Sequence, residues 1–182
     1  MSRHPGFRQT VVEPFKQDVA GWQRRGWFGD ARPPRTAFLV LRYNGLRATL
    51  LHRLAYWATV RRVPMLAGLL ANLNLSLHGI EMTPHVPVGP GLYLPHTVGT
   101  VINARSIGAN VEIQSCVTVG LKDLAEFPVI HDNVQLAAGC RVLGNICLGS
   151  GVRVGANAVV LNDVDPGQTV VGVPARPIGA KA

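Results

Sequence analysis

The stretch that decides the fold is Ile130–Leu161, IHDNVQLAAGCRVLGNICLGSGVRVGANAVVL. Aliphatic residues recur in it at every sixth position, and a second apolar series lies four positions after each of them. The first series is Ile130, Leu136, Val142, Leu148, Val154 and Val160; the second is Val134, Cys140, Ile146, Val152, Ala158 and Val164. Neither an α-helix nor a flat strand has a period of six. We therefore expect short flat sides, each one hexapeptide, that stack their aliphatic residues inside a coil.

The same period extends upstream of this stretch. It starts at Met82, slips by one residue at Val101 and brings the number of hexads to thirteen; the upstream members are Met82, Val88, Leu94, Val101, Ile107, Ile113 and Val119. Gly, Asn and Asp lie between the apolar positions, as expected of corners that need left-handed backbone angles. Eleven residues separate Val119 from Ile130, so five extra residues within 121–129 must leave the coil as an external loop. Such a loop lies on the binding face or is a tolerated surface insertion.

The region before the coil has a different pattern. Residues 1–35 are expected to be an irregular basic arm that permits a short helix over Glu13–Trp22. Residues 36–80 carry apolar side chains at helical spacing and are expected to form two helices, with Pro64 in the first turn of the second and Gly79 at its end. Residues 81–178 then form the coil domain.

Composition narrows the class of protein. Of 182 residues 47% are hydrophobic and 15% charged, which excludes a disordered chain. Residues 1–63 hold 12 Lys and Arg against 3 Asp and Glu, whereas residues 64–182 are nearly neutral, so a nucleic-acid partner is not expected. Three cysteines and no apolar run long enough to cross a bilayer favour a cytoplasmic protein. The arginines of the first region either solvate an outer face or contact an anionic membrane at its inner surface.

Several motifs resemble those of the hexapeptide-repeat acyltransferases, closest to the serine acetyltransferase branch and, within it, to exopolysaccharide (colanic-acid-type) O-acetyltransferases. The motifs are Pro95–Gly99 (PHTVG), Val117–Gly120 (VTVG), Val142–Asn145 (VLGN), Val154–Leu161 (VGANAVVL) and Val171–Arg176 (VGVPAR). The resemblance implies a left-handed parallel β-helix with three sides per turn, hence about four turns. It further implies a homotrimer with acetyl-CoA as co-substrate between neighbouring coils.

The reaction implied by the resemblance needs a base, because a protonated hydroxyl is a poor nucleophile. His96 matches the family's catalytic histidine, whereas His131 is expected to be a solvated coil residue. Fifteen residues before His96 stands Glu81, where the serine enzymes have an aspartate that orients the imidazole. Glu81 either takes that role or only opens the coil domain.

Matching to the family also assigns the binding residues. The backbones of Gly120, Ala138 and Ala156 are expected to hold the pantetheine arm, and Arg176 or Lys181 the nucleotide phosphates. Pro95 replaces an aspartate of the serine enzymes, and the pair Glu126–Phe127 replaces their Arg-His pair before the loop proline.

These replacements remove the partners of an amino acid's charged groups, and Phe127 could stack on a sugar ring. We therefore expect transfer of acetyl to a carbohydrate hydroxyl in polysaccharide or glycoconjugate biosynthesis. The alternatives are L-serine, as in cysteine biosynthesis, or another small hydroxyl compound. No complex with cysteine synthase is expected, since the terminal Gly-Ala-Lys-Ala lacks the isoleucine that docks into it.

Two other classes share this period. A γ-type carbonic anhydrase needs three zinc-binding histidines, two of them five residues apart in the coil, and this pattern is absent; no metal is expected. A non-catalytic β-helix that acts as an assembly module is not excluded by the period, but His96 in its motif argues against it.

Overall fold

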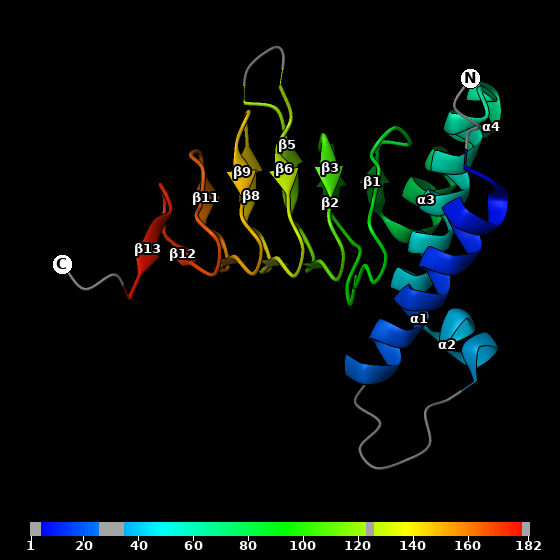
Figure 1. Cartoon of the computed structure of the whole chain (residues 1–182), viewed down its shortest axis with the longest axis horizontal. Helices are drawn as coiled ribbons and strands as arrows, with labels where there is room; N and C mark the ends of the chain where they lie inside the picture. The colour runs from blue at the N-terminus through cyan, green and yellow to red at the C-terminus, as the bar shows by residue number, and fades with distance from the viewer. Residues whose placement is uncertain (1–4, 26–34, 123–125, 180–182) are drawn as a thin grey trace.

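The computed structural model describes residues 5–25, 35–122 and 126–179 and shows a group of helices at one end of an elongated coil of strands (Figure 1). The helical segments are the π-helical η1 (Arg8–Val12), α1 (Glu13–Arg25), α2 (Thr36–Arg42), α3 (Asn44–Val60) and α4 (Pro64–His78). A parallel β-helix follows them, so the fold class expected from the sequence is confirmed. No helix within the described ranges is both long and apolar enough to cross a membrane.

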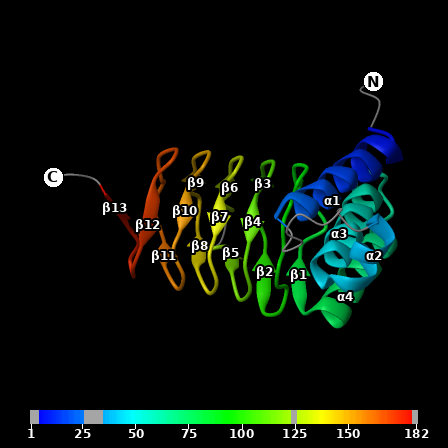
Figure 2. The ribbon, with the colours of Figure 1, turned by 90° about the horizontal axis from the view of Figure 1, so that it is seen from below.

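Three sheets form the sides of the coil, and from β2 to β11 successive strands along the chain belong to successive sheets (Figure 2). The first sheet consists of β1 (Ile80–Met82), β2 (Thr100–Ile102), β5 (Thr118–Gly120), β8 (Arg141–Leu143) and β11 (Val159–Val160). The second consists of β3 (Ser106–Ile107), β6 (Val129–Ile130) and β9 (Cys147–Leu148). The third consists of β4 (Glu112–Ile113), β7 (Gln135–Leu136), β10 (Arg153–Val154), β12 (Thr169–Val171) and β13 (Arg176–Ile178).

The coil has about five turns rather than four. Five strands stack in the first sheet, and the coil continues beyond the last hexad at Val160. Val164 pairs with Leu148 and Val170 with Val154, so a further turn is completed by Val164, the last member of the second series, and by Val170, which lies beyond both series. All pairs are parallel except β12 with β13, where the chain reverses and Val170 faces Pro177.

One position of the predicted register is wrong. The aliphatic residue inside the coil at β2 is Ile102, which is fully buried, and not Val101, which is only half-buried. Ile102 pairs with Met82 on one side and with Val119 on the other. The spacing from Leu94 to Ile102 is two residues longer than a hexad, and the spacing from Ile102 to Ile107 is one residue shorter. The slip of one residue seen in the sequence is the net result.

Three edges separate the sheets, and we name them by the sheets that they join. The edge between the third and the first sheet, called here the first edge, carries residues 96–99, 115–116, 138–139 and 156–157. Gly99, Cys116, Gly139 and Asn157 have positive φ angles of 72°, 60°, 73° and 57° there. The edge between the first and second sheets, called the second edge, carries the external loop, which ends before Val129 of β6 and of which residues 123–125 lie outside the described part.

The helices form one packed group with the first turn of the coil. A buried apolar cluster joins Val19 and Trp22 of α1, Leu39 of α2, Leu46 of α3 and Tyr93 of the coil. The chain is therefore helical from residue 8 to residue 25, where the sequence predicted an irregular arm; the tertiary contacts of Val19 and Trp22 stabilise a helix longer than the one it permitted. Two features of α4 are confirmed: Pro64 begins it, and Gly79 ends it with a φ of 65°.

Candidate active site

A cavity of about 550 Å³ lies beside His96, where the helices meet the third sheet of the coil. It is lined by Trp22, Arg25, Tyr43, Tyr93, Pro95, His96, Glu112 and Gln114. Two of these residues come from α1, one from the junction of α2 and α3, and five from the first two turns of the coil. Of the described cavities, this is the one that holds the histidine predicted to be the base.

The alternation of the coil strands determines which residues face this cavity. Leu94 and Ile113 are fully buried inside the coil, one turn apart, so the residues on either side of each point outward. The N–H of Ile113 donates to the carbonyl of Tyr93 at 3.0 Å, which holds the two turns in register. Tyr93 and Pro95 therefore lie next to Glu112 and Gln114 on the outward face of the coil, where the helices cover Tyr93.

Two opposite charges face each other in the cavity. Arg25 Nη1 lies 4.0 Å from Glu112 Oε2, and the guanidinium of Arg25 lies over the ring of Tyr93, 5.0 Å from its centroid. Gln114 donates its amide to Glu112 Oε1 at 2.7 Å. Burial and the nearby carboxylate of Glu112 raise the pKa of Tyr93, so its phenol stays protonated and can donate a hydrogen bond at neutral pH.

His96 is exposed at the first edge of the coil. Thr97 Oγ1 donates to the carbonyl of His78 at 2.6 Å, and the N–H of Gly99 donates to the carbonyl of Gly79 at 2.9 Å. These bonds hold the turn with His96 against the start of β1, the strand that carries Glu81. The side chain of Glu81 is exposed, and no hydrogen bond joins it to His96 among the described interactions. Its role in orienting the imidazole therefore stays a prediction.

The residues predicted to bind acetyl-CoA do not all lie together in one chain. Ala138 and Ala156 are exposed on the first edge, as is His96, and the N–H of Asn157 donates to the carbonyl of Ala138 at 3.0 Å. Gly120 lies at the end of β5 on the second edge, with open space where a side chain would begin. Arg176 is exposed on β13; Lys181 lies outside the described residues.

The loop residues predicted to bind the acceptor lie away from His96 within one chain. Glu126 is exposed and Phe127 half-buried, and both precede Pro128, whose carbonyl accepts the N–H of Arg105 at 2.8 Å. They belong to the second edge and do not line the cavity beside His96. Pro95 does line it. One chain therefore offers Pro95 to an acceptor, but not Glu126 or Phe127.

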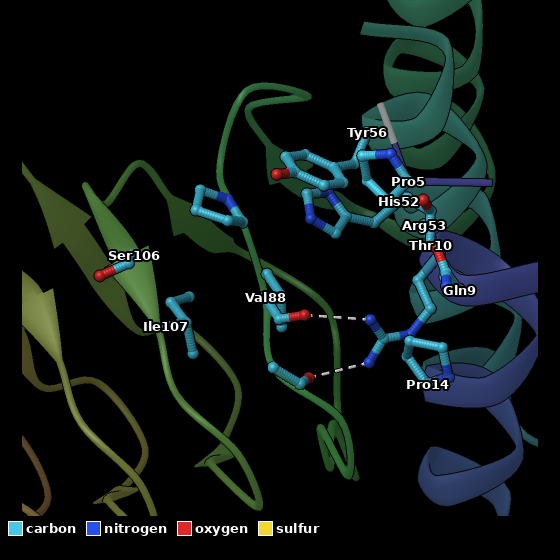
Figure 3. Close-up of a pocket in the computed structure, with 12 residues that line it drawn as sticks. Pro5, Gln9, Thr10, Pro14, His52, Arg53, Tyr56, Val88, Ser106 and Ile107 are labelled. Carbon is cyan, nitrogen blue, oxygen red and sulfur yellow. Dashed lines mark hydrogen bonds between the residues drawn. The ribbon is translucent and has the colours of Figure 1, made fainter. Parts of the chain in front are cut away.

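A second cavity, of about 330 Å³, lies between α1, α3 and the second sheet (Figure 3). Arg53 reaches from α3 to the coil and donates to the carbonyls of Val88 and Gly89 at 3.1 and 2.9 Å. His52 Nε2 lies 3.1 Å from the carbonyl of Val86, and burial lowers the pKa of His52 to about 4. His52 and Arg53 join the helices to the coil, and both are buried, whereas His96 is exposed.

Neither a cluster of metal-binding side chains nor a cysteine that lines the cavity beside His96 is found in the described ranges. No group of three or more His, Cys, Asp or Glu residues there could hold a metal ion. The three cysteines are unpaired: Cys140 is buried, which raises the pKa of its thiol to about 12, and Cys116 and Cys147 do not line the cavity beside His96.

Comparison with known proteins agrees with this geometry. The family model described as bacterial transferase hexapeptide (six repeats) matches residues 127–162. The serine acetyltransferase of Helicobacter pylori strain J99 is 40% identical over 146 residues, which cover 77% of this chain and 84% of that enzyme. The serine acetyltransferase of Synechococcus elongatus is 39% identical over 144 residues, covering 77% of this chain. This chain belongs to the serine acetyltransferase family of hexapeptide-repeat transferases.

Solved structures of serine acetyltransferases superpose on most of the chain. The Neisseria gonorrhoeae serine acetyltransferase in complex with serine matches with a TM-score of 0.84 and 31% identity, covering 93% of this chain and 69% of that one. A serine acetyltransferase in complex with CoA matches with a TM-score of 0.83 and 28% identity, over 93% of this chain and 70% of that one. The chain spans only 59% of the length of the Synechococcus serine acetyltransferase that it matches.

Sequence reasoning missed several residues of the cavity. Glu112, Gln114 and Tyr93 flank hexad positions one turn apart, so stacking the predicted turns would have brought them together beside Pro95. Arg25, Trp22 and Tyr43 come from the helical region, and no local pattern connects them to the coil.

Proposed function

We propose that this protein is an acetyl-CoA-dependent O-acetyltransferase whose acceptor is the hydroxyl of L-serine or a close analogue. The observation that carries the proposal is the position of His96, exposed at the edge of the coil and lining a cavity with charged and hydrogen-bonding side chains. Membership in the serine acetyltransferase family supports the reaction class.

The chemistry follows from one base and two substrates. The imidazole of His96 removes the proton of the acceptor hydroxyl as its oxygen attacks the thioester carbonyl carbon. The tetrahedral intermediate collapses, the carbon–sulfur bond breaks, and the sulfur leaves with the proton that the imidazolium returns. Acetyl ester and free CoA are the products, and His96 is restored to its neutral form.

The comparisons with known proteins change the acceptor that we propose. The sequence favoured a carbohydrate hydroxyl, but the similar proteins are named serine acetyltransferases, and one is solved with serine. They support L-serine, the alternative, better than a sugar. Glu126 and Phe127, which argued for a sugar, lie with Gly120 on another edge from His96, so they meet His96 only if a second protomer supplies them.

A sugar remains the second candidate because of the size of the cavity. About 550 Å³ is large for a single serine, and three aromatic side chains, Trp22, Tyr43 and Tyr93, line it. However, the ring of Trp22 already packs on both tyrosines, with centroids 4.7 and 4.8 Å apart, so these rings are partly covered.

Binding of acetyl-CoA fits the first edge, where small residues leave room for the pantetheine arm. Ala138 and Ala156 lie there in consecutive turns, on the same edge as His96. Gly120 faces another edge, so it meets the same CoA only if a second protomer supplies it. The proposed site is therefore completed between protomers, as the family resemblance implies for a trimer.

Self-association is also supported by the surface of α4. Four large apolar side chains, at intervals of four residues, follow one side of this helix and are exposed to between 39% and 88%: Met65, Leu69, Leu73 and Leu77. Residues four apart lie on the same face of a helix. Sedimentation of the purified protein should show a trimer or a larger assembly; an active monomer would contradict the shared site.

The activity is tested by release of free CoA from acetyl-CoA with a panel of acceptors: L-serine, L-homoserine, L-threonine, free sugars and nucleotide sugars. We expect kcat/KM for L-serine of ~10⁴ M⁻¹s⁻¹ or more, in the range of a dedicated enzyme. Turnover of a sugar with none of L-serine would replace the acceptor. No acceptor-dependent release of CoA at all would overturn the proposal.

A further inference from the structure

The geometry points to Arg25 and Glu112 as a recognition pair for an α-amino acid: Arg25 binds the carboxylate of the acceptor and Glu112 its ammonium group. This inference rests on the proposed function, because it names what holds the acceptor beside His96. It assigns specificity to a helix residue and a coil residue for which no role was expected from the sequence.

Arg25 is held in place with one nitrogen still available. Its guanidinium packs on Tyr93, and Nη2 donates to the carbonyl of Asn110 at 3.4 Å. Nη1 is buried and makes no hydrogen bond among the described interactions. A buried guanidinium nitrogen without a partner costs free energy, and a ligand carboxylate supplies the partner that it lacks.

Glu112 is similarly anchored through one oxygen. Gln114 occupies Oε1, whereas Oε2 lies 4.0 Å from Arg25 Nη1, which is too far for a hydrogen bond. The side chains of Arg25 and Glu112 are 32% and 22% exposed, so both charges are largely removed from water. Each has capacity for a further partner, and neither satisfies the other.

The spacing of these charges suits a zwitterion. In an α-amino acid the carboxylate and the ammonium group are attached to the same carbon, so they are close enough to engage two opposite charges a few ångströms apart. The third substituent of that carbon in serine carries the hydroxyl, and His96 lines the same cavity. A neutral sugar would bring no charged partner to Arg25 Nη1, which lacks a hydrogen bond, or to Glu112 Oε2.

The sequence argued against serine because the charged partners of an amino acid were missing, and Arg25 and Glu112 can replace those partners. Pro95 and Glu126 stand where the serine enzymes carry charged partners for the amino acid, which suggested that both partners are missing. Here α1 and β4 supply a cation and an anion from other positions, so a zwitterionic acceptor can be held without them.

The test compares the full-length wild-type protein with Arg25→Gln and Glu112→Gln. Each substitution removes one charge and keeps a polar side chain of similar length. Matched controls are Arg24→Gln, an exposed neighbour on α1 outside the cavity, and Glu13→Gln, on the same helix, whose side chain is 43% exposed. Kinetics are measured with L-serine, with L-serinamide, which lacks the carboxylate, and with 3-hydroxypropionate, which lacks the ammonium group. Binding of L-serine is measured separately by calorimetry.

We expect Arg25→Gln to raise KM for L-serine ~10–100-fold while KM for acetyl-CoA stays unchanged. The same variant should lose the preference of the wild type for L-serine over L-serinamide. Glu112→Gln should lose the preference for L-serine over 3-hydroxypropionate. Such crossed changes in preference would not follow from a merely structural role, and both controls should retain the wild-type pattern.

The outcomes separate this inference from the proposed function. Turnover of L-serine with unchanged preferences in both variants would overturn the recognition pair and leave the function standing. Calorimetric binding of L-serine that Arg25→Gln and Glu112→Gln weaken, without turnover by the wild type, would support the pair and overturn the function. Failure of the wild type to bind L-serine would overturn the pair whatever other acceptor is used.

Discussion

Asp18 of α1 and Arg53 of α3 form a buried bidentate ion pair, with nitrogen–oxygen distances of 2.7 and 2.6 Å. Asp18 Oδ1 also accepts the N–H groups of Gly91 and Leu92 at 2.8 and 2.9 Å. Arg53 in turn donates to two carbonyls of the same turn of the coil (Figure 3). Two helices far apart in sequence thereby satisfy the backbone of the turn that precedes His96.

Asp18→Asn should destabilise the fold strongly, because it leaves Arg53 buried without its counter-charge. We expect a loss of ~3–5 kcal/mol in the free energy of unfolding, measured by urea titration followed by circular dichroism. Glu13→Gln is the control: it breaks only exposed contacts with Arg8 and Lys16 and should leave the unfolding midpoint unchanged. Equal midpoints for the two variants would show that the buried pair contributes little.

His52 should make stability depend on pH. The carbonyl of Val86 can only accept, so Nε2 carries the hydrogen, and Nδ1 is buried without a partner. Burial lowers the pKa of His52 from 6.5 to about 4 in the folded state. The unfolded chain therefore takes up a proton first, and stability is lost as pH falls from about 6.5 towards 4, by ~3 kcal/mol in total.

This dependence is measured as the unfolding free energy between pH 7.5 and pH 4.5. His52→Gln should flatten the curve over that range, whereas His131→Gln, an exposed histidine on the coil, should not. A wild-type stability that stays constant down to pH 4.5 would contradict the buried neutral state of His52.

His96→Ala should lower kcat ~10²–10⁴-fold with little change in acetyl-CoA binding, because the base is lost and the coil core is untouched. Glu81→Gln tests the orienting role and should lower kcat less, without altering KM. His131→Ala provides the control on another edge of the coil. Near-wild-type activity of His96→Ala with the true acceptor would remove His96 from the mechanism.

Two helix glycines should respond oppositely to alanine. A side chain at Gly45 would overlap the carbonyl of Leu94 and crowd the ring of Trp22, so Gly45→Ala should destabilise the protein by ~1–3 kcal/mol. Gly68 of α4 has nothing within 4 Å of an added Cβ, so Gly68→Ala should stabilise it by ~0.5–1 kcal/mol. Thermal unfolding of both variants checks the prediction, and destabilisation by Gly68→Ala would contradict it.

Much of the coil could be predicted from the sequence because each hexad is a local signal. Leu136, Val142, Leu148 and Val154 point inward as the period requires, and all are at most 2% exposed. The error at Val101 arose because one side of the coil is two residues longer than a hexad and the next side is one residue shorter. The spacing of apolar residues in the sequence shows only the net shift of one residue.

The cavity was harder to predict because three of its eight lining residues come from the helical region and reach it only through long-range packing. His96 and Pro95 were found through a motif, and Glu112 and Gln114 could have been found by stacking one turn on the next. Arg25 required knowing that α1 packs against the coil, and that packing depends on Asp18, 73 residues before its partner Gly91. No period in the sequence encodes such a contact.

The reversal of the chain at β13 covers the end of the third sheet. A stack of parallel turns ends in a row of unpaired backbone groups, and such a row invites a second molecule to continue it end to end. At the far end from the helices, β13 runs antiparallel to β12 and carries Pro177, which has no N–H to donate. The third sheet therefore ends, for a second molecule, in an antiparallel strand that lacks one donor and not in the parallel edge that the turns of the coil pair through.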